Sequence, residues 1–252
     1  MTYSMIGHCP ETGAFGGVVG TSALGVGNRC LKVCHGRGAF LSQHRTDTRL
    51  AELGIAYLAE GVKAQDAMDK VVNGARNIDW RQLAALDAAG GTATYHGKKM
   101  YSIYTGTEGQ DCVAIGNILA NHQVTDAMVA AFEASRGAAL AERLLQGLEA
   151  GRDAGGEIME PIRSAALFVS GEEGIAQYDL RVDSSLEAAA GLRDLFAEYG
   201  EQHALIRAVA LTPEDIPVSR TLFEASIKRI GELGLEARFP TEKNRDAWKL
   251  RD

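Results

Sequence analysis

Residues 2–21 read TYSMIGHCPETGAFGGVVGT, and this stretch decides the fold class. Two apolar runs, at residues 3–8 and 15–21, flank Pro10-Glu11-Thr12-Gly13, whose residue types favour a tight turn. Short strand-forming runs on either side of a turn predict a β-hairpin. The first 38 residues hold 9 of the 29 glycines of the chain, which fits strands and turns in which backbones approach closely.

Beyond the hairpin, strand and helix signals come in groups. Strands are predicted at residues 37–43, 82–87, 92–95 and 112–117, and as a second hairpin at 163–170 and 175–182. Helices are predicted at 47–60, 64–73, 124–149 with a break near Gly137, 186–199 and 218–233, while 204–211 fits a strand or a helix. This grouping predicts an α+β fold with antiparallel sheets. We expect one domain over residues 1–200 and a mostly helical C-terminal extension over 201–252, packed on the domain or at an oligomer interface.

Composition excludes several classes of protein. With 252 residues, of which 46% are hydrophobic and 23% charged, the chain has the averages of a globular protein. A net charge of −7 argues against a nucleic-acid partner or an anionic membrane surface. No apolar run approaches the roughly 18 residues of a membrane helix, so we expect no membrane partner and a cytoplasmic protein. The four cysteines are then expected as reduced thiols: Cys9, Cys30, Cys34 and Cys112.

The sequence lacks the common cofactor and metal motifs. Gly20 and Gly25 have the first spacing of a phosphate-binding loop, but Val26 stands where that loop needs lysine. Cys30 and Cys34, if they share a strand, lie about 13 Å apart, which is too far for a disulfide. Their spacing matches no common zinc motif. We therefore expect no cofactor and no metal.

Thr2 is the candidate nucleophile that the sequence favours most. Threonine is small enough at the second position for Met1 to be removed, which would leave Thr2 with both a hydroxyl nucleophile and a free α-amine. That amine has an ordinary pKa of about 7.7–8.0, so it can act as the general base for its own hydroxyl near neutral pH. The plain alternative is a strand residue without a catalytic role.

Seven short blocks of the sequence resemble a known family. They are PETG at 10–13, LAEG at 58–61, GNILA at 116–120, LAERLL at 140–145, AGG at 154–156, SAAL at 164–167 and DLRVD at 179–183. In this order, from Thr2 to about Phe196, the chain resembles the bacterial DUF1028 family of the N-terminal nucleophile (Ntn) hydrolase-like group. The resemblance implies a four-layer αββα sandwich of two stacked antiparallel sheets flanked by helices, and a homo-oligomer.

The resemblance matches Thr2 to the N-terminal nucleophile of the family. Asn117, in the GNILA block, is expected at the end of a strand, where its amide either donates to an oxyanion or caps a turn. Lys32 lies 30 residues after Thr2. That separation is similar to the one at which proteasome-like hydrolases place the lysine that lowers the pKa of the nucleophile. The alternative for Lys32 is an ordinary exposed side chain.

Three further residues are candidates for substrate binding. Gln43 and His44 match the end of a strand that commonly reads Thr-Gln-Ala in the family, so both are expected to line the cleft. Arg163 stands where the family commonly has glutamine. A guanidinium there favours an anionic ligand, or else forms an ion pair at a strand edge.

Together these features predict an amidohydrolase of the Ntn type, acting on a small amide or peptide-like substrate with Thr2 as nucleophile after Met1 removal. The first alternative is a non-catalytic small-ligand-binding or assembly protein on the same scaffold. The second is a thiol-dependent enzyme that uses Cys9 or Cys34.

Overall fold

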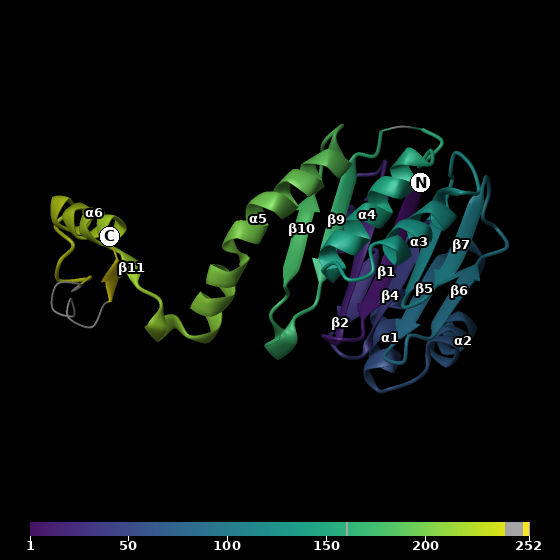
Figure 1. The fold of residues 1–252 in the computed structure, drawn as a ribbon, viewed down its shortest axis with the longest axis horizontal. Helices are drawn as coiled ribbons and strands as arrows, with labels where there is room; N and C mark the ends of the chain where they lie inside the picture. Colours follow the sequence, from purple (N-terminus) through teal and green to yellow (C-terminus); the bar gives the residue numbers. More distant parts are fainter. Residues whose placement is uncertain (160, 240–248, 252) are drawn as a thin grey trace. The chain divides into compact units, whose positions relative to one another are not determined.

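A computed structural model describes residues 1–159, 161–239 and 249–251. Within it the chain divides into two units, Met1–Glu198 and Tyr199–Asp252. The first unit combines helices with two antiparallel sheets (Figure 1), which confirms the predicted α+β class.

The larger sheet is built around the N-terminal hairpin. β1 (Thr2–Cys9) and β2 (Ala14–Thr21) pair antiparallel, as predicted from residues 2–21. β8 (Cys112–Asn117) pairs with the other edge of β1 and brings Asn117 opposite Thr2. The strand order β10-β9-β2-β1-β8-β7 is completed by β7 (Tyr104–Gly109), β9 (Ser164–Val169) and β10 (Tyr178–Val182).

The smaller sheet has the strand order β3-β4-β5-β6. Its strands are β3 (Leu31–Cys34), β4 (Gly38–Gln43), β5 (Gln82–Asp87) and β6 (Thr92–His96). Side chains from both sheets meet in one fully buried apolar cluster: Ile6, Phe15, Ala39, Leu41, Ala84, Leu86, Val113 and Ile115. Because side chains alternate across a strand, the other face of each sheet is left for helices.

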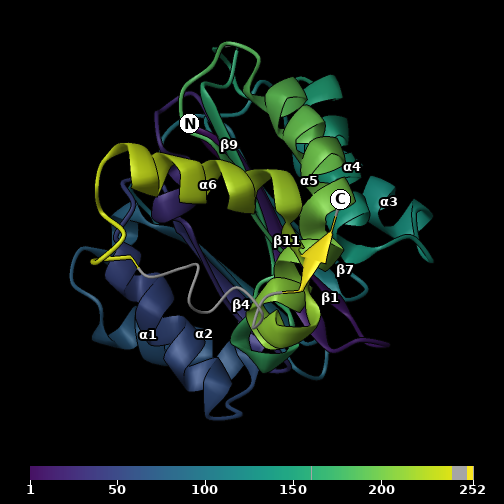
Figure 2. The same cartoon turned by 90° about the vertical axis from the view of Figure 1, so that its left-hand side faces the viewer.

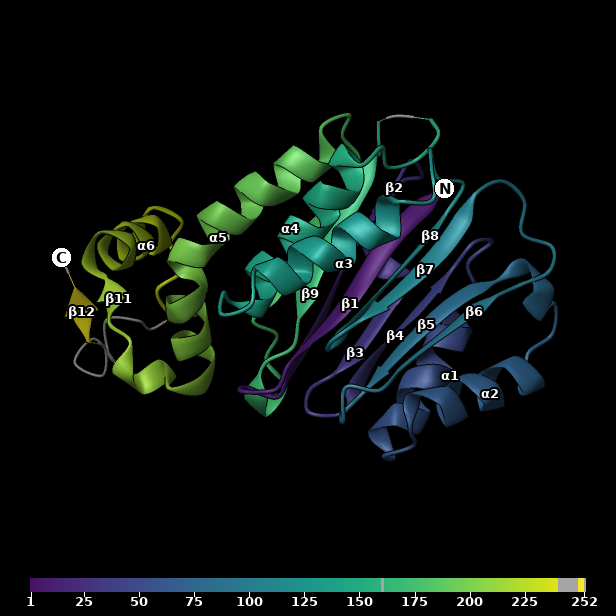
Figure 3. The same ribbon diagram turned by 45° about the vertical axis from the view of Figure 1, so that its right-hand side comes forward.

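Helices α3 (Val124–Ala134) and α4 (Leu140–Asp153) pack on the larger sheet (Figure 3). Glycine permits this close approach, since a Cβ added at Gly7 would lie 2.7 Å from the ring of Phe132. The predicted break in the 124–149 helix is confirmed, and Gly137 between the two helices takes a φ of 99°.

Helices α1 (Thr48–Ala59) and α2 (Ala64–Gly74) pack on the smaller sheet, away from α3 and α4 (Figure 2). α1 begins where the side chain of Asp47 accepts a hydrogen bond from the Arg49 backbone N–H. In the same helix, a Cβ at Gly54 would lie 2.3 Å from Phe40 of β4. The smaller sheet thus depends on a glycine contact as the larger one does.

Two strands of the first unit differ from the prediction. β7 is missing from it, because its residues alternate between exposed and half-buried with little apolar character, so the sequence carries no strand periodicity there. β3 begins at Leu31, so the expectation that Cys30 and Cys34 share a strand is wrong. Cys30 precedes the strand, and its carbonyl accepts a hydrogen bond from the Ser42 N–H at 2.9 Å.

The second unit begins at Tyr199, within α5 (Ala188–Leu211). Because α5 continues to Leu211, residues 204–211 are helical and not a strand. α6 (Arg220–Glu232) begins at Ser219, whose side chain accepts from the Leu222 backbone N–H. β11 (Val218–Ser219) and β12 (Leu250–Arg251) pair in parallel. None of the helices in the described ranges combines the length and the apolar character that crossing a membrane requires.

Candidate active site

A cavity of about 230 Å³ opens at the end of the larger sheet where β1 begins. It is lined by Met1, Thr2, Thr21, Ala23, Arg29, Cys30, His44, Arg45, Thr46, Tyr101, Asn117 and Ile118. Of the six residues predicted for the site, the structure brings three together here, namely Thr2, Asn117 and His44.

Thr2 is held at this cavity by the three central strands of the larger sheet. Its side chain is 7% exposed, and its Oγ1 lies 3.2 Å from Thr21 Oγ1 at the end of β2. Both hydroxyls also contact the carbonyl oxygen of Met1. On its other side, Thr2 faces Asn117 of β8 in register. The hydroxyl that the sequence singles out is therefore fixed among polar groups at the cavity wall.

Backbone strain gathers at the same cavity. His44, Arg45 and Ile118 have φ values of 55°, 49° and 55°, in the left-handed region that residues with a side chain rarely adopt. The conformation is least favourable for a β-branched residue such as Ile118. Residues held in such conformations cluster at functional sites, so this cavity is the candidate site.

His44 presents a hydrogen-bond acceptor to the cavity. Its Nδ1 lies 2.7 Å from the backbone carbonyl oxygen of Trp80, so Nδ1 must carry the proton. Burial lowers the pKa of His44 below its ordinary value, which keeps the ring neutral near pH 7 and leaves Nε2 as an acceptor. The ring of Tyr101 stands edge-on to it at a centroid distance of 5.7 Å.

Asn117 ends a buried chain of amide side chains between the sheets. Its Nδ2 donates to Gln82 Oε1 at 3.0 Å, and Gln43 Nε2 donates to the same oxygen at 2.8 Å. Ser4 Oγ in turn donates to Gln43 Oε1 at 2.7 Å. Among the described residues, Asn117 Oδ1 has no hydrogen-bond donor, although Asn117 is only 1% exposed.

Gln43, predicted to bind substrate, does not line the cavity. It is completely buried and belongs to the amide chain, whereas the next residue, His44, reaches the cavity wall. β4 ends at Gln43, and the chain turns at His44, where φ is 55°, so these two neighbouring side chains reach different surroundings.

Lys32 and Arg163 also lie outside the lining. The neighbours of Lys32 in β3, Leu31 and Val33, pack into the core between the sheets. Lys32 itself points the other way, with Nζ 3.3 Å from Glu52 of α1. Arg163 approaches the site through its backbone, where its N–H donates to Thr21 O at 2.7 Å.

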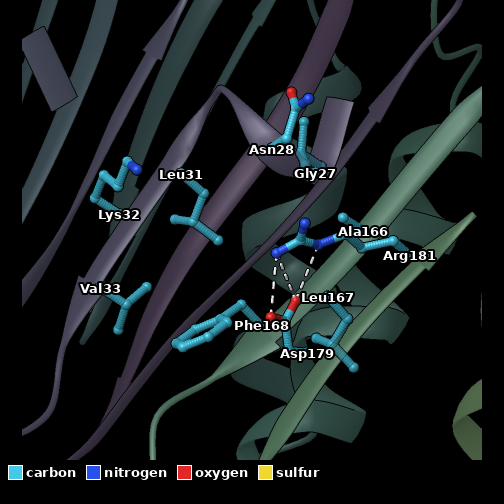
Figure 4. A pocket seen from close by; sticks show the side chains of 11 residues that line it. Gly27, Asn28, Leu31, Lys32, Val33, Ala166, Leu167, Phe168, Asp179 and Arg181 are labelled. Carbon is cyan, nitrogen blue, oxygen red and sulfur yellow. Dashed lines mark hydrogen bonds and ion pairs between the residues drawn. The ribbon is translucent and has the colours of Figure 1, made fainter. Parts of the chain in front are cut away.

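A second cavity, of about 280 Å³, lies beside Lys32 (Figure 4). Phe168 and the ion pair of Arg181 with Asp179 line it on the β9 and β10 side, and Leu31 and Val33 on the β3 side. It contains none of the polar groups around Thr2, so Lys32 and Thr2 belong to different surfaces of the first unit.

The charge of the Thr2 cavity is positive. Arg29 and Arg45 line it, and none of its described lining residues is Asp or Glu. Arg29 is anchored by hydrogen bonds from Nη1 to Leu24 O and Gly25 O, and Arg45 lies over the Trp80 ring at 4.3 Å. Across the described ranges no three His, Cys, Asp or Glu side chains are grouped so that they could hold a metal.

Six polar or strained lining residues were not predicted for the site: Thr21, Arg29, Arg45, Thr46, Tyr101 and Ile118. Thr21 could have been found, because a hairpin that begins at Thr2 and turns at residues 10–13 returns to a point opposite it. Ile118 could have been found as well, because it directly follows Asn117 in the GNILA block. Arg29 and Tyr101 come from connecting segments whose approach no local pattern predicts.

The candidate site is thus a threonine hydroxyl at the start of a central strand, in a strained polar cavity of a two-sheet α+β protein. A family model described as a family of unknown function, DUF1028, matches residues 2–192. The chain therefore belongs to the DUF1028 family, which confirms the resemblance of its sequence blocks.

One solved structure gives the same assignment. The crystal structure of protein SPO2555 from Silicibacter pomeroyi, of family model DUF1028, is 30% identical to this chain. It has a TM-score of 0.72 and covers 78% of this chain and 85% of its own. Anbu (ancestral beta-subunit) from Yersinia bercovieri is 9% identical, with a TM-score of 0.37 over 82% of this chain and 96% of its own. A likeness at that level supports no inference. No curated protein matches the sequence.

Proposed function

We propose that the protein is an amidohydrolase of the N-terminal nucleophile type and that the Thr2 cavity is its active site. The observation that carries the proposal is the position of Thr2, nearly buried at the start of β1 and in the wall of a strained cavity. The packing of one helix pair on each sheet supports the four-layer αββα sandwich of that class.

The proposed reaction begins when Met1 is removed. The α-amine of Thr2 accepts the proton of Thr2 Oγ1 as this oxygen attacks the amide carbon of the substrate. The carbonyl electrons move onto oxygen, and the Thr21 hydroxyl, 3.2 Å from Thr2 Oγ1, is placed to donate to that oxyanion. The tetrahedral intermediate expels the amine, which takes the proton held by the Thr2 amine. Water then hydrolyses the Thr2 ester and regenerates the hydroxyl.

The size and charge of the cavity define the substrate class. With Met1 in its wall the cavity measures about 230 Å³, below the roughly 300–1,000 Å³ of typical ligand pockets. Removal of Met1 enlarges it by the space of one residue, so the substrate is a small amide. Arg29 and Arg45, without an opposing carboxylate among the described lining residues, favour an amide that carries a carboxylate.

One observation favours a second function, the binding of a small ligand without catalysis. While Met1 is attached, the nitrogen of Thr2 is an amide and has no basic lone pair. The Thr2 and Thr21 hydroxyls then both contact the Met1 carbonyl oxygen. In this form the cavity can bind a ligand, but Thr2 lacks its base.

Replacement of Thr2 separates the two functions. Thr2→Ala should lower turnover of small carboxylate-bearing amides by on the order of 10³-fold or more, while the melting temperature stays within a few degrees. Thr2→Ser, which keeps a hydroxyl and an amine, should retain measurable turnover. Equal turnover by the unchanged protein and by Thr2→Ala would contradict the proposal, and unchanged ligand affinity without turnover in either protein would favour the binding function.

A further inference from the structure

We propose that Asn117 holds the α-amine of mature Thr2 through its Oδ1 atom, and that Gln82 is the positioning residue that fixes Asn117 in this orientation. The inference rests on the proposed function, because the amine forms only when Met1 is removed. It gives Asn117 the role of an acceptor, in place of the two roles that the sequence leaves open, an oxyanion donor or a turn cap.

The backbone fixes the orientation of the Gln82 amide. Gln82 Nε2 lies 2.8 Å from the carbonyl oxygen of Gly116 and 3.1 Å from that of Thr105. Backbone carbonyls can only accept hydrogen bonds, so the atom that faces both of them must be the nitrogen. Gln82 Oε1 must therefore face the opposite way, toward Gln43 and Asn117.

The orientation of Asn117 follows from that of Gln82. An atom 3.0 Å from the acceptor Gln82 Oε1 must be a donor, so Asn117 turns Nδ2 toward Gln82. Its Oδ1 then points away from Gln82, is buried, and has no donor among the described residues. Buried carbonyl oxygens are nearly always satisfied, so Oδ1 is an acceptor that a donor on a neighbouring residue can fill.

Removal of Met1 creates such a donor beside Asn117. Thr2 and Asn117 are direct partners in the β1–β8 register, and side chains of opposed residues lie about 5 Å apart. The new α-amine carries two or three N–H groups on the residue across from Asn117 Oδ1. One of them would satisfy Oδ1 and hold the amine in a fixed orientation next to Thr2 Oγ1.

This contact also affects the pKa of the amine. A hydrogen bond to an acceptor favours the ammonium form and raises its pKa. Arg29, His44 and Arg45 line the same cavity, and the positive charge of the arginines acts in the opposite direction. These three side chains stay the same in every variant of the test, so differences between variants report on the acceptor.

The test measures the α-amine directly and needs no substrate. Full-length protein that begins at Thr2 is prepared by cleavage of a fusion and verified by intact mass. Its amine is titrated through the pH dependence of carbamylation by cyanate, followed by mass spectrometry of the N-terminal peptide. Asn117→Leu and Gln82→Leu should each lower the amine pKa by about 0.5–1. Asn117→Asp should raise it, because it keeps an oxygen acceptor and adds a negative charge. Tyr101→Phe, in the same cavity, is the matched control and should not change it.

Unchanged amine pKa values in Asn117→Leu and Asn117→Asp would overturn the proposal. If Asn117→Leu is poorly folded, Asn117→Asp alone decides through the direction of its shift. A loss of turnover in Asn117→Leu at constant amine pKa would assign Asn117 to the oxyanion instead. Absence of turnover in all proteins would contradict the hydrolase proposal, while the titration would still test the contact between Asn117 and Thr2.

Discussion

Thr2 and Asn117 lie opposite each other on β1 and β8, at the end of the larger sheet where both strands meet the cavity. This register places a hydroxyl with a potential N-terminal amine next to an amide whose orientation is set by Gln82. The chemistry proposed here depends on that juxtaposition more than on any other pair of residues.

The charge of the cavity predicts how Arg45 affects substrate binding. Loss of one charge-assisted hydrogen bond costs about 1.5–3 kcal/mol, so Arg45→Gln should raise KM for a carboxylate-bearing amide by roughly tenfold or more. The KM for a neutral amide of the same size should change little. Lys32→Gln removes a cation from the other cavity and serves as the control. Equal changes in this KM in Arg45→Gln and Lys32→Gln would show that Arg45 does not bind the carboxylate of the substrate.

Cysteine labelling tests the alternative of a thiol-dependent enzyme. Burial raises the pKa of the Cys30 thiol, and burial together with Glu133 raises the pKa of Cys112 to about 12. At pH 7.5 iodoacetamide should therefore modify these two only after unfolding in urea, as read from tryptic peptides. Native protein labelled at the half-buried Cys9 and Cys34 should keep its turnover. Loss of turnover on labelling would instead support the thiol mechanism.

Two buried histidines and one half-buried histidine predict that stability falls in mild acid. Burial lowers the pKa of His8, His44 and His96 in the folded state. Below about pH 6.5 the unfolded chain then binds more protons than the folded one, so the free energy of unfolding decreases as pH falls. The decrease ends once pH is below the folded pKa values.

Urea unfolding between pH 8 and pH 5 measures this dependence. His96→Gln should give a shallower decrease than the unchanged chain, because it removes one of the three groups. A free energy of unfolding that is constant over this range would show that these rings protonate as easily in the folded protein as in the unfolded chain.

Two helical glycines test the packing of the smaller sheet. Gly54→Ala in α1 places a Cβ 2.3 Å from Phe40 and should destabilise the protein by about 1–3 kcal/mol. Gly74→Ala at the end of α2 meets nothing within 4 Å and should stabilise it by about 0.4–1 kcal/mol. Urea unfolding of both variants measures whether each substitution lowers or raises the free energy of unfolding. The same sign for both would contradict the contact between α1 and β4.

The sequence predicted the parts of the fold in which local pattern and tertiary structure agree. The hairpin of β1 and β2 was found because apolar runs, a turn and glycines coincide in residues 2–21. β7 was missed because an exposed edge strand needs no apolar alternation. Cys30 lies one residue before β3, where its carbonyl still accepts a hydrogen bond from Ser42 near the end of β4, so the sequence pattern misses the strand start by a single residue.

Two of the three predicted residues that line the cavity have positions that follow from their place along a strand. Thr2 and Asn117 stand at strand ends, so their place in the sheet follows from its register. Lys32 was chosen by a separation of 30 residues, which carries no information about the direction of a side chain. The strain at Ile118 and the approach of Tyr101 arise from packing between distant segments, and the residue types there give no sign of it.

Acylation of Thr2 tests the central claim most directly. A small β-lactone that carries a carboxylate should open on Thr2 Oγ1 and leave an ester that mass spectrometry locates on the N-terminal peptide. We expect this adduct in protein that begins at Thr2, and no adduct in Thr2→Ala or in protein that retains Met1. An adduct at other residues only, or equal acylation of Thr2 with Met1 attached, would contradict it.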